Sequence, residues 1–592
     1  MKKLRRIFVL KTLGRNFVNG LLTITKVNSL LKILKSHDCF SSLPADSRTL
    51  LKTPRSTNIK DIGGGGKYCH FGIREKVTQI SYINLYPIVR EHQLIKLQTN
   101  VDGLPLLQSS RSNLWPILIA LEDHDFIPPF VVFHGTSKPE NVEMYMADYV
   151  QEISKLIEDG IECMGRNYKI CVTSYICDAP ARAFLAQIKG HTGYFSCSKC
   201  KIKGIYTSNG VVFDKFESPL RTHDDFVNMT DEQHHLPNKT SPLIVIPGIN
   251  MVDHFPFEYM HLVCLGVMRK ILYSFMKGSN YKVRLTATIL DQLSVKIVNL
   301  RPYIPSEFGR KSRSLQELLR WKAMEFRQIL LYTGPLLFPK FLSCDVYNHF
   351  ISLHYAIRIL SSRLYASQQL QYARSLLKNF VSNFPLVYSL PSLSYNVHGL
   401  LHLADDVQLH GPLDNFSAFK FENKLQQLKK LIRKHDKPLQ QIARRIFEKE
   451  MAMKVQEVCN YPVLKKASGI NSALPLGLVN PIYNSVEFKD FKITQKRPNN
   501  CVVMKNGDIC VVQLIANKFG KPHFLGHKFK DVSDFYSKPG SSQVIGIHCA
   551  KGLSQAQLLP VSGIKNKALM IPLDPHNGDE SFYIAEMLHI SL

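Results

Sequence analysis

Two short motifs place metal-binding side chains at the spacings that zinc sites use. Cys197 and Cys200 are separated by two residues, as in a zinc half-site. His398 and His402 are four residues apart, which puts both imidazoles on one face of a helix. Together they predict one structural zinc ion with two sulfur and two nitrogen ligands. The alternative is an idle buried cysteine pair and two ordinary helix histidines.

Two aspartates that end predicted strands indicate a different kind of metal site. Asp102 follows an alternating strand over 95–101, and Asp178 follows an apolar strand over 168–177. In-line displacement at phosphorus can use two divalent ions to clamp the attacking and leaving oxygens. Mg²⁺ is held by few carboxylates together with water and phosphate oxygens, so such a site needs about three acids from separate elements.

The elements around these aspartates follow a definite order. Apolar periodicity and Pro139, which suits a first helical turn, predict strand, strand, strand, helix, strand and helix. Their bounds are 95–101, 114–121, 130–133, 142–157, 168–177 and 180–186. This is the order of a ribonuclease H-like fold, in which the first and fourth strands lie side by side. Asp102 and Asp178 would then face each other.

The predicted fold class is α/β, with a ribonuclease H-like catalytic core interrupted by a large, mostly helical insertion. Helical stretches such as 315–331 and 365–380 predict the insertion, and short strands with Gly and Asn turns predict a small C-terminal all-β domain. The expected parts are a basic segment with a short helix (1–60), a linker containing a flexible four-glycine run (61–89), the first part of the core (90–200), the insertion (201–400), the end of the core (401–455) and the β-rich domain (485–592).

Charge and cysteine usage narrow the functional classes. The 592 residues include 75 Lys and Arg against 47 Asp and Glu, a net charge of +28. This surplus favours a polyanionic partner, although a basic protein kept soluble by its charge is the alternative. Thirteen unevenly spaced cysteines do not form the framework of a secreted disulfide protein. No apolar run is long enough to predict a membrane span.

The first 37 residues contain nine Lys or Arg and no acid. Residues 2–6 are typical of a nuclear-localisation cluster, which favours the nucleus. An Arg-rich start without acids is also typical of a mitochondrial transit peptide, and a truncated upstream domain is a third interpretation.

Several sequence blocks, in a shared order over roughly residues 30–450, resemble the transposases of the CACTA/EnSpm group. The most specific are Asp-Ala-Pro-Ala-Arg-Ala-Phe at 178–184 and Gly-His-Thr-Gly-Tyr at 190–194, followed by Cys197 and Cys200. The other blocks are 101–106, 260–267, 411–413 and 421–423. The zinc layout is similar to that of the antigen-receptor recombinase and its transposon relatives.

The resemblance implies a DDE-type DNA transposase with Asp102, Asp178 and Glu422 as the catalytic acids that bind Mg²⁺ or Mn²⁺. It also implies DNA as the partner and a dimer or larger homo-oligomer. Each acid has a local alternative: a turn aspartate before Gly103, a helix cap before Pro180, and a first-turn glutamate that complements a helix dipole.

Two further features bear on activity. Glu258 lies three residues before His261, where the family usually has Asp or Cys, so both are possible neighbours of the active site. The alternative is that they cap and pack an apolar helix. A predicted helix over 421–434 carries a basic face for DNA binding, made of Lys424, Lys429, Lys430, Arg433 and Lys434. The second hypothesis for the whole chain is a domesticated, catalytically inactive DNA- or chromatin-binding protein.

Overall fold

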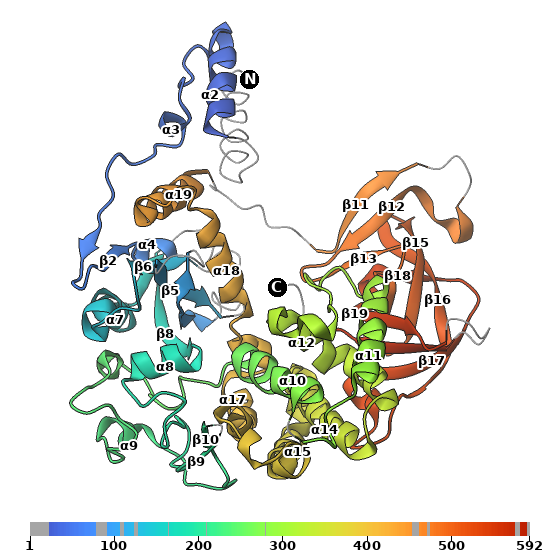
Figure 1. Ribbon diagram of the computed structural model, residues 1–592. Helices are drawn as coiled ribbons and strands as arrows, with labels where there is room; N and C mark the ends of the chain where they lie inside the picture. The colour runs from blue at the N-terminus through green and yellow to red at the C-terminus, as the bar shows by residue number, and fades with distance from the viewer. Residues whose placement is uncertain are drawn as a thin grey trace.

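The computed structural model describes residues 23–77, 92–106, 112–122, 128–163, 165–208, 210–278, 280–452, 461–469, 474–574 and 581–588. They form an N-terminal stalk (23–55), a mixed α/β sheet lobe, a helical middle and a C-terminal all-β lobe (Figure 1). The basic cluster at 2–6 lies outside the described residues. None of the described helices is both long and apolar enough to span a bilayer.

The sheet lobe is built on eight strands in the order β1-β2-β6-β5-β3-β8-β7, with β4 paired to β5. Strand β3 runs parallel to β8, whereas β5 is antiparallel to both β3 and β6. The carboxyl ends of β3 and β8 therefore lie side by side. The strands are β1 (Lys60–Asp61), β2 (Lys67–His70), β3 (Leu94–Val101), β4 (Leu104–Pro105), β5 (Asn113–Leu121), β6 (Pro129–Gly135), β7 (Ile161–Cys163) and β8 (Arg166–Ile176).

The four-glycine run is a hairpin turn, which corrects its interpretation as a flexible joint in a linker. Gly63, Gly64 and Gly65 have φ values of 82°, 58° and 73°, a backbone region that glycine enters without steric cost. The turn joins β1 to β2, and β2 then pairs with β6. The segment 61–89 therefore contributes a strand to the sheet.

The sheet is buried on both faces. Along β5, Ile117 and Ile119 enter one core with α7 (Val142–Asp159). Leu118 and Ala120, which alternate with them, enter the large core of the helical middle. Because successive side chains of a strand point to opposite faces, this pattern places the sheet between two layers of helices.

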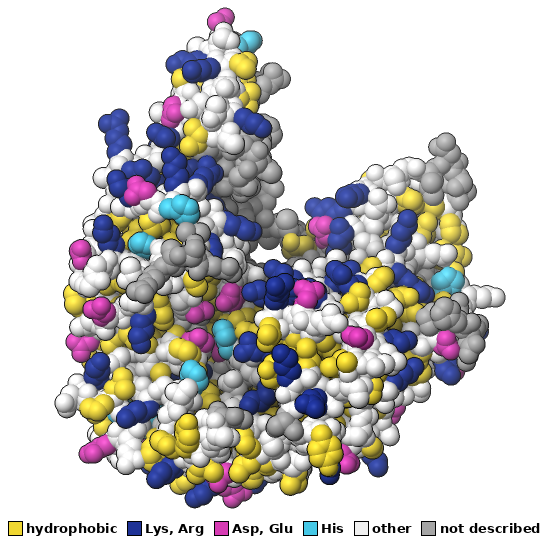
Figure 2. Space-filling model, in the orientation of Figure 1, with side chains coloured by type: hydrophobic (Ala, Val, Ile, Leu, Met, Phe, Trp, Pro, Cys, Tyr) yellow, Lys and Arg dark blue, Asp and Glu magenta, His cyan; other side chains and the backbone are white. Residues whose placement is uncertain are grey.

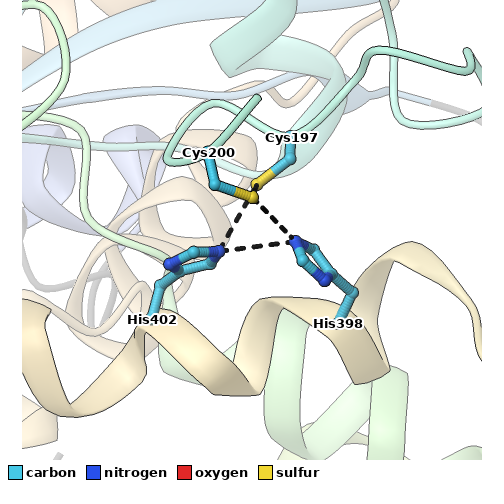
Figure 3. A group of neighbouring side chains, drawn as sticks. All are labelled: Cys197, Cys200, His398 and His402. Carbon is cyan, nitrogen blue, oxygen red and sulfur yellow. Dashed lines mark hydrogen bonds between the residues drawn. The ribbon is translucent and has the colours of Figure 1, made fainter. Parts of the chain in front are cut away.

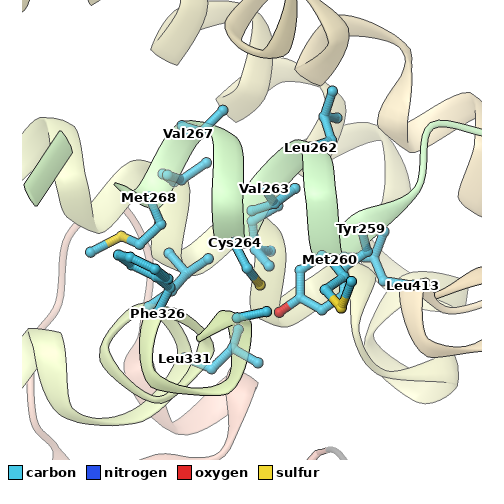
Figure 4. Close-up of a cluster of buried hydrophobic side chains, with 14 of the residues drawn as sticks. Tyr259, Met260, Leu262, Val263, Cys264, Val267, Met268, Phe326, Leu331 and Leu413 are labelled. Carbon is cyan, nitrogen blue, oxygen red and sulfur yellow. The ribbon is translucent and has the colours of Figure 1, made fainter. Parts of the chain in front are cut away.

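The helical middle begins with a section that contains little helix, 187–258, and only then becomes mostly helical. The π-helix η3 (Met260–Met268) passes through the centre of its core, where side chains from neighbouring helices surround it (Figure 4). Its main elements are β9 (Ile205–Thr207), β10 (Gly210–Val212), α9 (His223–Val227), α10 (Arg269–Lys277), α11 (Ala287–Asn299), α14 (Cys344–Leu360), α15 (Arg363–Tyr388), α16 (Tyr395–Gly399), η9 (Leu400–His402) and α17 (Leu403–His410).

Two predicted helices have different bounds in the structure. The stretch 315–331 is broken into η5 (Leu315–Arg320), α12 (Ala323–Gln328) and η6 (Ile329–Thr333). The break arises because Trp321 is extended, with ψ of 145°, and Glu325 caps a new helix by accepting from the Lys322 N–H at 2.8 Å.

The second is the predicted helix 421–434, which corresponds to α18 (Phe419–Lys430). Arg433 and Lys434 therefore lie in the turn before α19 (Pro438–Ala452) rather than on the face of α18.

The β lobe contains a closed barrel. Strands β15, β14, β19, β20, β17 and β16 pair in sequence, and a β15–β16 pairing closes the ring. All six strands contribute to one buried cluster. The strands of the lobe are β11 (Val463–Ser468), β12 (Val479–Glu487), β13 (Lys492–Thr494), β14 (Cys501–Met504), β15 (Ile509–Lys518), β16 (Lys521–Asp534), β17 (Ile547–Leu553), β18 (Gln557–Pro560), β19 (Ile564–Pro572) and β20 (Ser581–Glu586).

Candidate functional site

Two of the predicted acids stand at the carboxyl ends of the parallel strand pair. Asp102 follows β3 directly, and its Oδ1 accepts from the Gly103 N–H at 2.7 Å. Asp178 follows β8 and is the N-cap of α8 (Ala179–Ala186), where its Oδ1 accepts from the Ala181 N–H at 2.8 Å. Each of these hydrogen bonds uses one carboxylate oxygen, so the second oxygen of each aspartate can still bind a metal ion.

The third predicted acid comes from α18, which runs between the sheet lobe and the helical middle (Figure 1). One ligand atom each from Asp102, His261 and Glu422 lies within 4.8 Å of the others. Asp178 is outside this group of three, but its charge acts on Asp102. All four side chains are half-buried. The site is therefore accessible to solvent. Figure 2 shows Asp, Glu and His side chains on the surface between the sheet lobe and the helical middle.

Glu258 fastens the start of α18 to the start of η3. Its buried carboxylate accepts from the Met260 N–H at 2.6 Å, the His261 N–H at 2.7 Å and the Ala418 N–H at 2.7 Å. His261 Nδ1 also lies 2.7 Å from Glu258 Oε2. The imidazole is thereby fixed beside Asp102 and Glu422. Glu258 caps a helix, which was the alternative considered from the sequence, and it also orients His261 and the start of α18.

The acids and the histidine change one another's proton affinity. Burial and the negative charge of Asp178 raise the pKa of Asp102 to about 7. Burial opposes the charged form of His261, but the hydrogen bond and charge of Glu258 outweigh it and raise the pKa of His261 to about 9. Burial likewise opposes ionisation of Glu258, yet its bond to His261 holds its pKa below the ordinary value. A cationic imidazole thus stands among the acids at neutral pH.

The predicted zinc ligands converge into a second, fully buried cluster (Figure 3). Cys200 Sγ lies 3.5 Å from Cys197 Sγ and 3.3 Å from His398 Nε2. His402 Nε2 lies 3.6 Å from Cys197 Sγ and 3.4 Å from His398 Nε2. A tetrahedral zinc with Zn–S of about 2.3 Å and Zn–N of about 2.0–2.1 Å separates its ligand atoms by about 3.3–3.8 Å. The donor set and its spacing therefore fit zinc.

The surroundings of the thiols favour a bound cation. Burial opposes ionisation of Cys197, but the hydrogen bond from Cys200 and the two imidazoles outweigh it and lower the pKa of Cys197 well below its usual value. The bond that Cys200 donates, followed by burial, raises the pKa of Cys200. Thiolates are the form that binds metal, so a divalent ion would relieve the repulsion that keeps the second thiol protonated.

Polar contacts brace this cluster against the rest of the helical middle. Lys199, between the two cysteines, forms a buried ion pair with Asp406 on α17, with Nζ and Oδ1 2.7 Å apart. Asp406 also accepts from the Phe257 N–H at 2.7 Å, just before Glu258. Arg221 Nε donates to the Cys197 carbonyl at 3.0 Å. These contacts therefore hold the segment 197–200, α17 and the segment before η3 together.

The residues predicted to bind DNA are distributed along α18 and the turn after it. Lys430, Arg433 and Lys434 are exposed. Lys429 is half-buried and its Nζ donates to the Pro105 carbonyl at 2.7 Å. Lys424 is half-buried, and burial together with the charge of Lys449 lowers its pKa to about 8.

Sequence reasoning missed the residues that hold α18 in place. Gln98 on β3 donates to the Asn415 carbonyl at 2.9 Å and accepts from Lys420 Nζ at 2.5 Å. The fully buried Arg327 pairs with Asp414, with Nη2 and Oδ2 2.6 Å apart, and lies over the Phe419 ring. These pairs join residues that are far apart in the sequence, so no local sequence pattern predicts them.

Comparison with known proteins assigns no function. One family model, described as a domain of unknown function (DUF8592), matches residues 468–587. The match coincides with the β lobe and leaves the sheet lobe and the helical middle unmatched. No curated protein matches the chain.

Metal analysis tests the sulfur and nitrogen cluster. Purified protein should carry about one zinc ion per chain, because four ligands at these spacings close a structural site. Cys197→Ser with Cys200→Ser should remove it. As a control, Cys510→Ser changes a buried cysteine of the β lobe and should leave the zinc content unchanged. Full zinc retention in the double variant would contradict the assignment.

Thermal unfolding measured against pH tests the acidic cluster, by which we mean Asp102, Asp178, Glu422 and His261. Because the pKa of Asp102 is raised from 3.8 to about 7, the folded state binds more protons than the unfolded state between these values, and stability falls as pH rises through them. In buffer without added Mg²⁺ or Mn²⁺, Asp102→Asn should therefore unfold several degrees above the wild type at pH 8 and at about the same temperature near pH 4.

The control for this experiment is Asp148, whose carboxylate pairs with Lys60 at 2.9 Å. Burial opposes its ionisation, but the hydrogen bond from Lys60 outweighs it and lowers the pKa of Asp148. Asp148→Asn should not stabilise the protein at pH 8. An Asp102→Asn variant that is no more stable than the wild type at pH 8 would show that the acids do not repel one another.

Proposed function

We propose that the chain is a DDE-type DNA transposase, or a protein derived from a transposon, that cleaves and joins DNA strands by two-metal phosphoryl transfer. The observation that carries the proposal is the placement of three acids from separate elements: Asp102 and Asp178 follow one parallel strand pair, and Glu422 of α18 lies in one group with Asp102 and His261. The strand order β6-β5-β3-β8, antiparallel and then parallel, supports a ribonuclease H-like core.

The blocks that resemble CACTA/EnSpm transposases support the same proposal, because they lie at the two clusters. Block 178–184 begins α8, block 190–194 leads into Cys197 and Cys200, and block 260–267 lies in η3. Fold alone would host many functions, so the argument rests on these side chains rather than on the sheet.

The donor set of the acidic cluster fits a hard divalent cation. Carboxylate oxygens are the ligands that Mg²⁺ and Mn²⁺ prefer, and repulsion between Asp102 and Asp178 is relieved by positive charge. When bound, such ions would activate and clamp the attacking and leaving oxygens of an in-line displacement. The chain's own part is to hold three acids at fixed positions, which Glu258, Gln98 and the cap of α8 accomplish.

His261 supports a second candidate function. Its imidazole stands within the acidic cluster and is cationic at neutral pH, where it partly neutralises the acids. A protein that keeps the fold, the zinc and DNA binding without cleavage would tolerate this arrangement. The alternative proposal is therefore a domesticated, catalytically inactive DNA- or chromatin-binding protein.

The remaining proposals follow from the transposase assignment. DNA is the partner, which a net charge of +28 supports through phosphate neutralisation. A homo-oligomer and a nuclear location are proposed with it.

The decisive experiment is cleavage of DNA that carries the element's own ends, with Mg²⁺ or Mn²⁺. Asp102→Asn, Asp178→Asn and Glu422→Gln should each abolish cleavage and leave DNA affinity nearly unchanged, because the acids act in the transition state. Double replacements should be little worse than single ones. Glu143→Gln, an exposed change on α7, is the matched control and should cleave normally.

Two outcomes would revise the proposal. A wild-type chain that binds DNA but does not cleave it would replace the transposase with the domesticated protein. Normal cleavage by Glu422→Gln would remove Glu422 from the triad and make Glu258 the next acid to replace.

The role of Glu258 in positioning is tested by Glu258→Gln. The carboxylate accepts from backbone N–H groups at both oxygens, so an amide must turn its own N–H groups toward donors. The variant should lose about 1–3 kcal/mol of unfolding free energy in denaturant titrations. Glu317→Gln, whose carboxylate is 45% exposed, should change it by less than about 0.5 kcal/mol. Equal stability of Glu258→Gln and wild type would contradict the role.

A further inference from the structure

The stalk is attached to the sheet lobe through α19. Its helices α2 (Ile24–Lys35) and α3 (Ser47–Leu50) are joined by Asn28, whose side chain bonds to Asp46 at 2.9 Å and accepts from the Ser47 N–H at 2.8 Å. The segment that follows α3 then contacts α19. Thr53 Oγ1 lies 2.6 Å from Glu448 Oε1, and Arg444 Nη2 donates to the Arg55 carbonyl at 2.8 Å.

The junction is strongly basic. Figure 2 shows Lys and Arg side chains gathered where the stalk joins the lobe. The two segments that meet there contribute Lys26, Lys32, Lys35, Arg48, Lys52, Arg55, Arg433, Lys434, Lys437, Arg444, Arg445 and Lys449. Three of their five acids have structural partners: Asp46 caps α3, Glu448 pairs with Arg445 at 2.7 Å, and Glu450 pairs with Lys76.

Four arginines from α3, α19 and the turn before α19 lie at this junction, and we call them the arginine cluster: Arg48, Arg433, Arg444 and Arg445. Arg433 is held near α19 because its N–H donates to Gln441 Oε1 at 2.9 Å. Burial lowers the pKa of Arg445, the charge of Glu448 opposes this, and the charges of Arg433, Arg48 and Arg444 lower it further. Glu448 is the carboxylate paired with this cluster, whereas the side chains of Arg48 and Arg433 are exposed to solvent.

The cluster lies at the far end of the helix that carries Glu422. Glu422 is in the first turn of α18, and Arg433 is just beyond its last turn. Eleven residues at 1.5 Å each give a separation of about 16 Å along the helix. At 3.4 Å per base pair, that is about five base pairs of duplex.

We propose that the arginine cluster binds backbone phosphates of duplex DNA on the segment that flanks the reacting phosphate. The inference rests on the proposed function, and it adds the stalk and α19 to the DNA-binding surface. Guanidinium groups bind phosphate oxygens through paired N–H donors, and an array of them suits a repeating polyanion. The exposed guanidinium groups of Arg48 and Arg433 would contact neighbouring phosphates of the DNA backbone.

The test is the salt dependence of duplex DNA binding by the full chain, followed by fluorescence anisotropy on a random-sequence duplex. Arg48→Gln with Arg433→Gln removes two exposed guanidinium groups of the cluster. The slope of log K against log salt should become shallower by about 1.8, since each phosphate contact contributes about 0.9. The matched control is Arg301→Gln with Arg363→Gln, two exposed arginines of the helical middle, which should keep the wild-type slope.

A second duplex separates the possible outcomes. Shortening the flank to fewer than about five base pairs from the cleavage site should abolish the difference between variant and control. An equal slope for variant and control, in a chain that still binds and cleaves DNA, would overturn the cluster and leave the proposed function standing. A slope change seen with single-stranded RNA but not with duplex DNA would overturn the choice of partner. Loss of salt-dependent DNA binding by the wild type would overturn both.

Discussion

The geometry of the acidic cluster depends on the buried carboxylate of Glu258. The site is formed by residues near positions 102, 178, 258 and 422, which are far apart in the sequence, so only non-covalent contacts hold them together. Glu258 receives N–H groups from the start of η3 and from Ala418, immediately before α18. One buried charge therefore satisfies two helix starts at once, and in a low-dielectric interior such charge-assisted bonds are strong and directional. The position of Glu422 and the orientation of His261 both follow from this contact.

The sulfur and nitrogen cluster supplies a second tie of a different kind. Cys197 lies 19 positions after Asp178, and Glu422 lies 20 positions after His402, so one metal-binding unit joins the two chain segments that lead to these acids. The buried pair of Lys199 with Asp406 and the bond from Asp406 to the Phe257 N–H extend this unit to the residue before Glu258. Buried polar contacts therefore connect the zinc-type cluster to the residue before Glu258.

Local sequence patterns predicted the elements that carry the chemistry but not the contacts that orient them. Strand β3 alternates in polarity, β5 and β8 are largely apolar, and the Cys and His spacings are local, so these features were predictable from the sequence. The hairpin β1–β2 was not, because strands of two and four residues with exposed positions have no periodicity. The partners of Glu258, Gln98 and Arg327 are backbone groups and charges from distant segments. Long-range pairing of this kind leaves no trace in a window of neighbouring residues.

The β lobe matched by the family of unknown function is attached to the helical middle through buried charged side chains. Arg358 of α14 is fully buried and donates to the carbonyls of Ile545 and Glu586 at 2.7 and 3.1 Å, so it satisfies backbone groups of the barrel from the helical middle. Lys567 of β19 is likewise buried, and its Nζ lies 2.6 Å from Glu307 Oε2. Removing the barrel would leave the Arg358 guanidinium and the Glu307 carboxylate without these partners, and breaking a buried ion pair costs far more than losing a surface contact. These buried contacts therefore fix the position of the barrel relative to the helical middle, which also carries Glu258 and the zinc-type ligands.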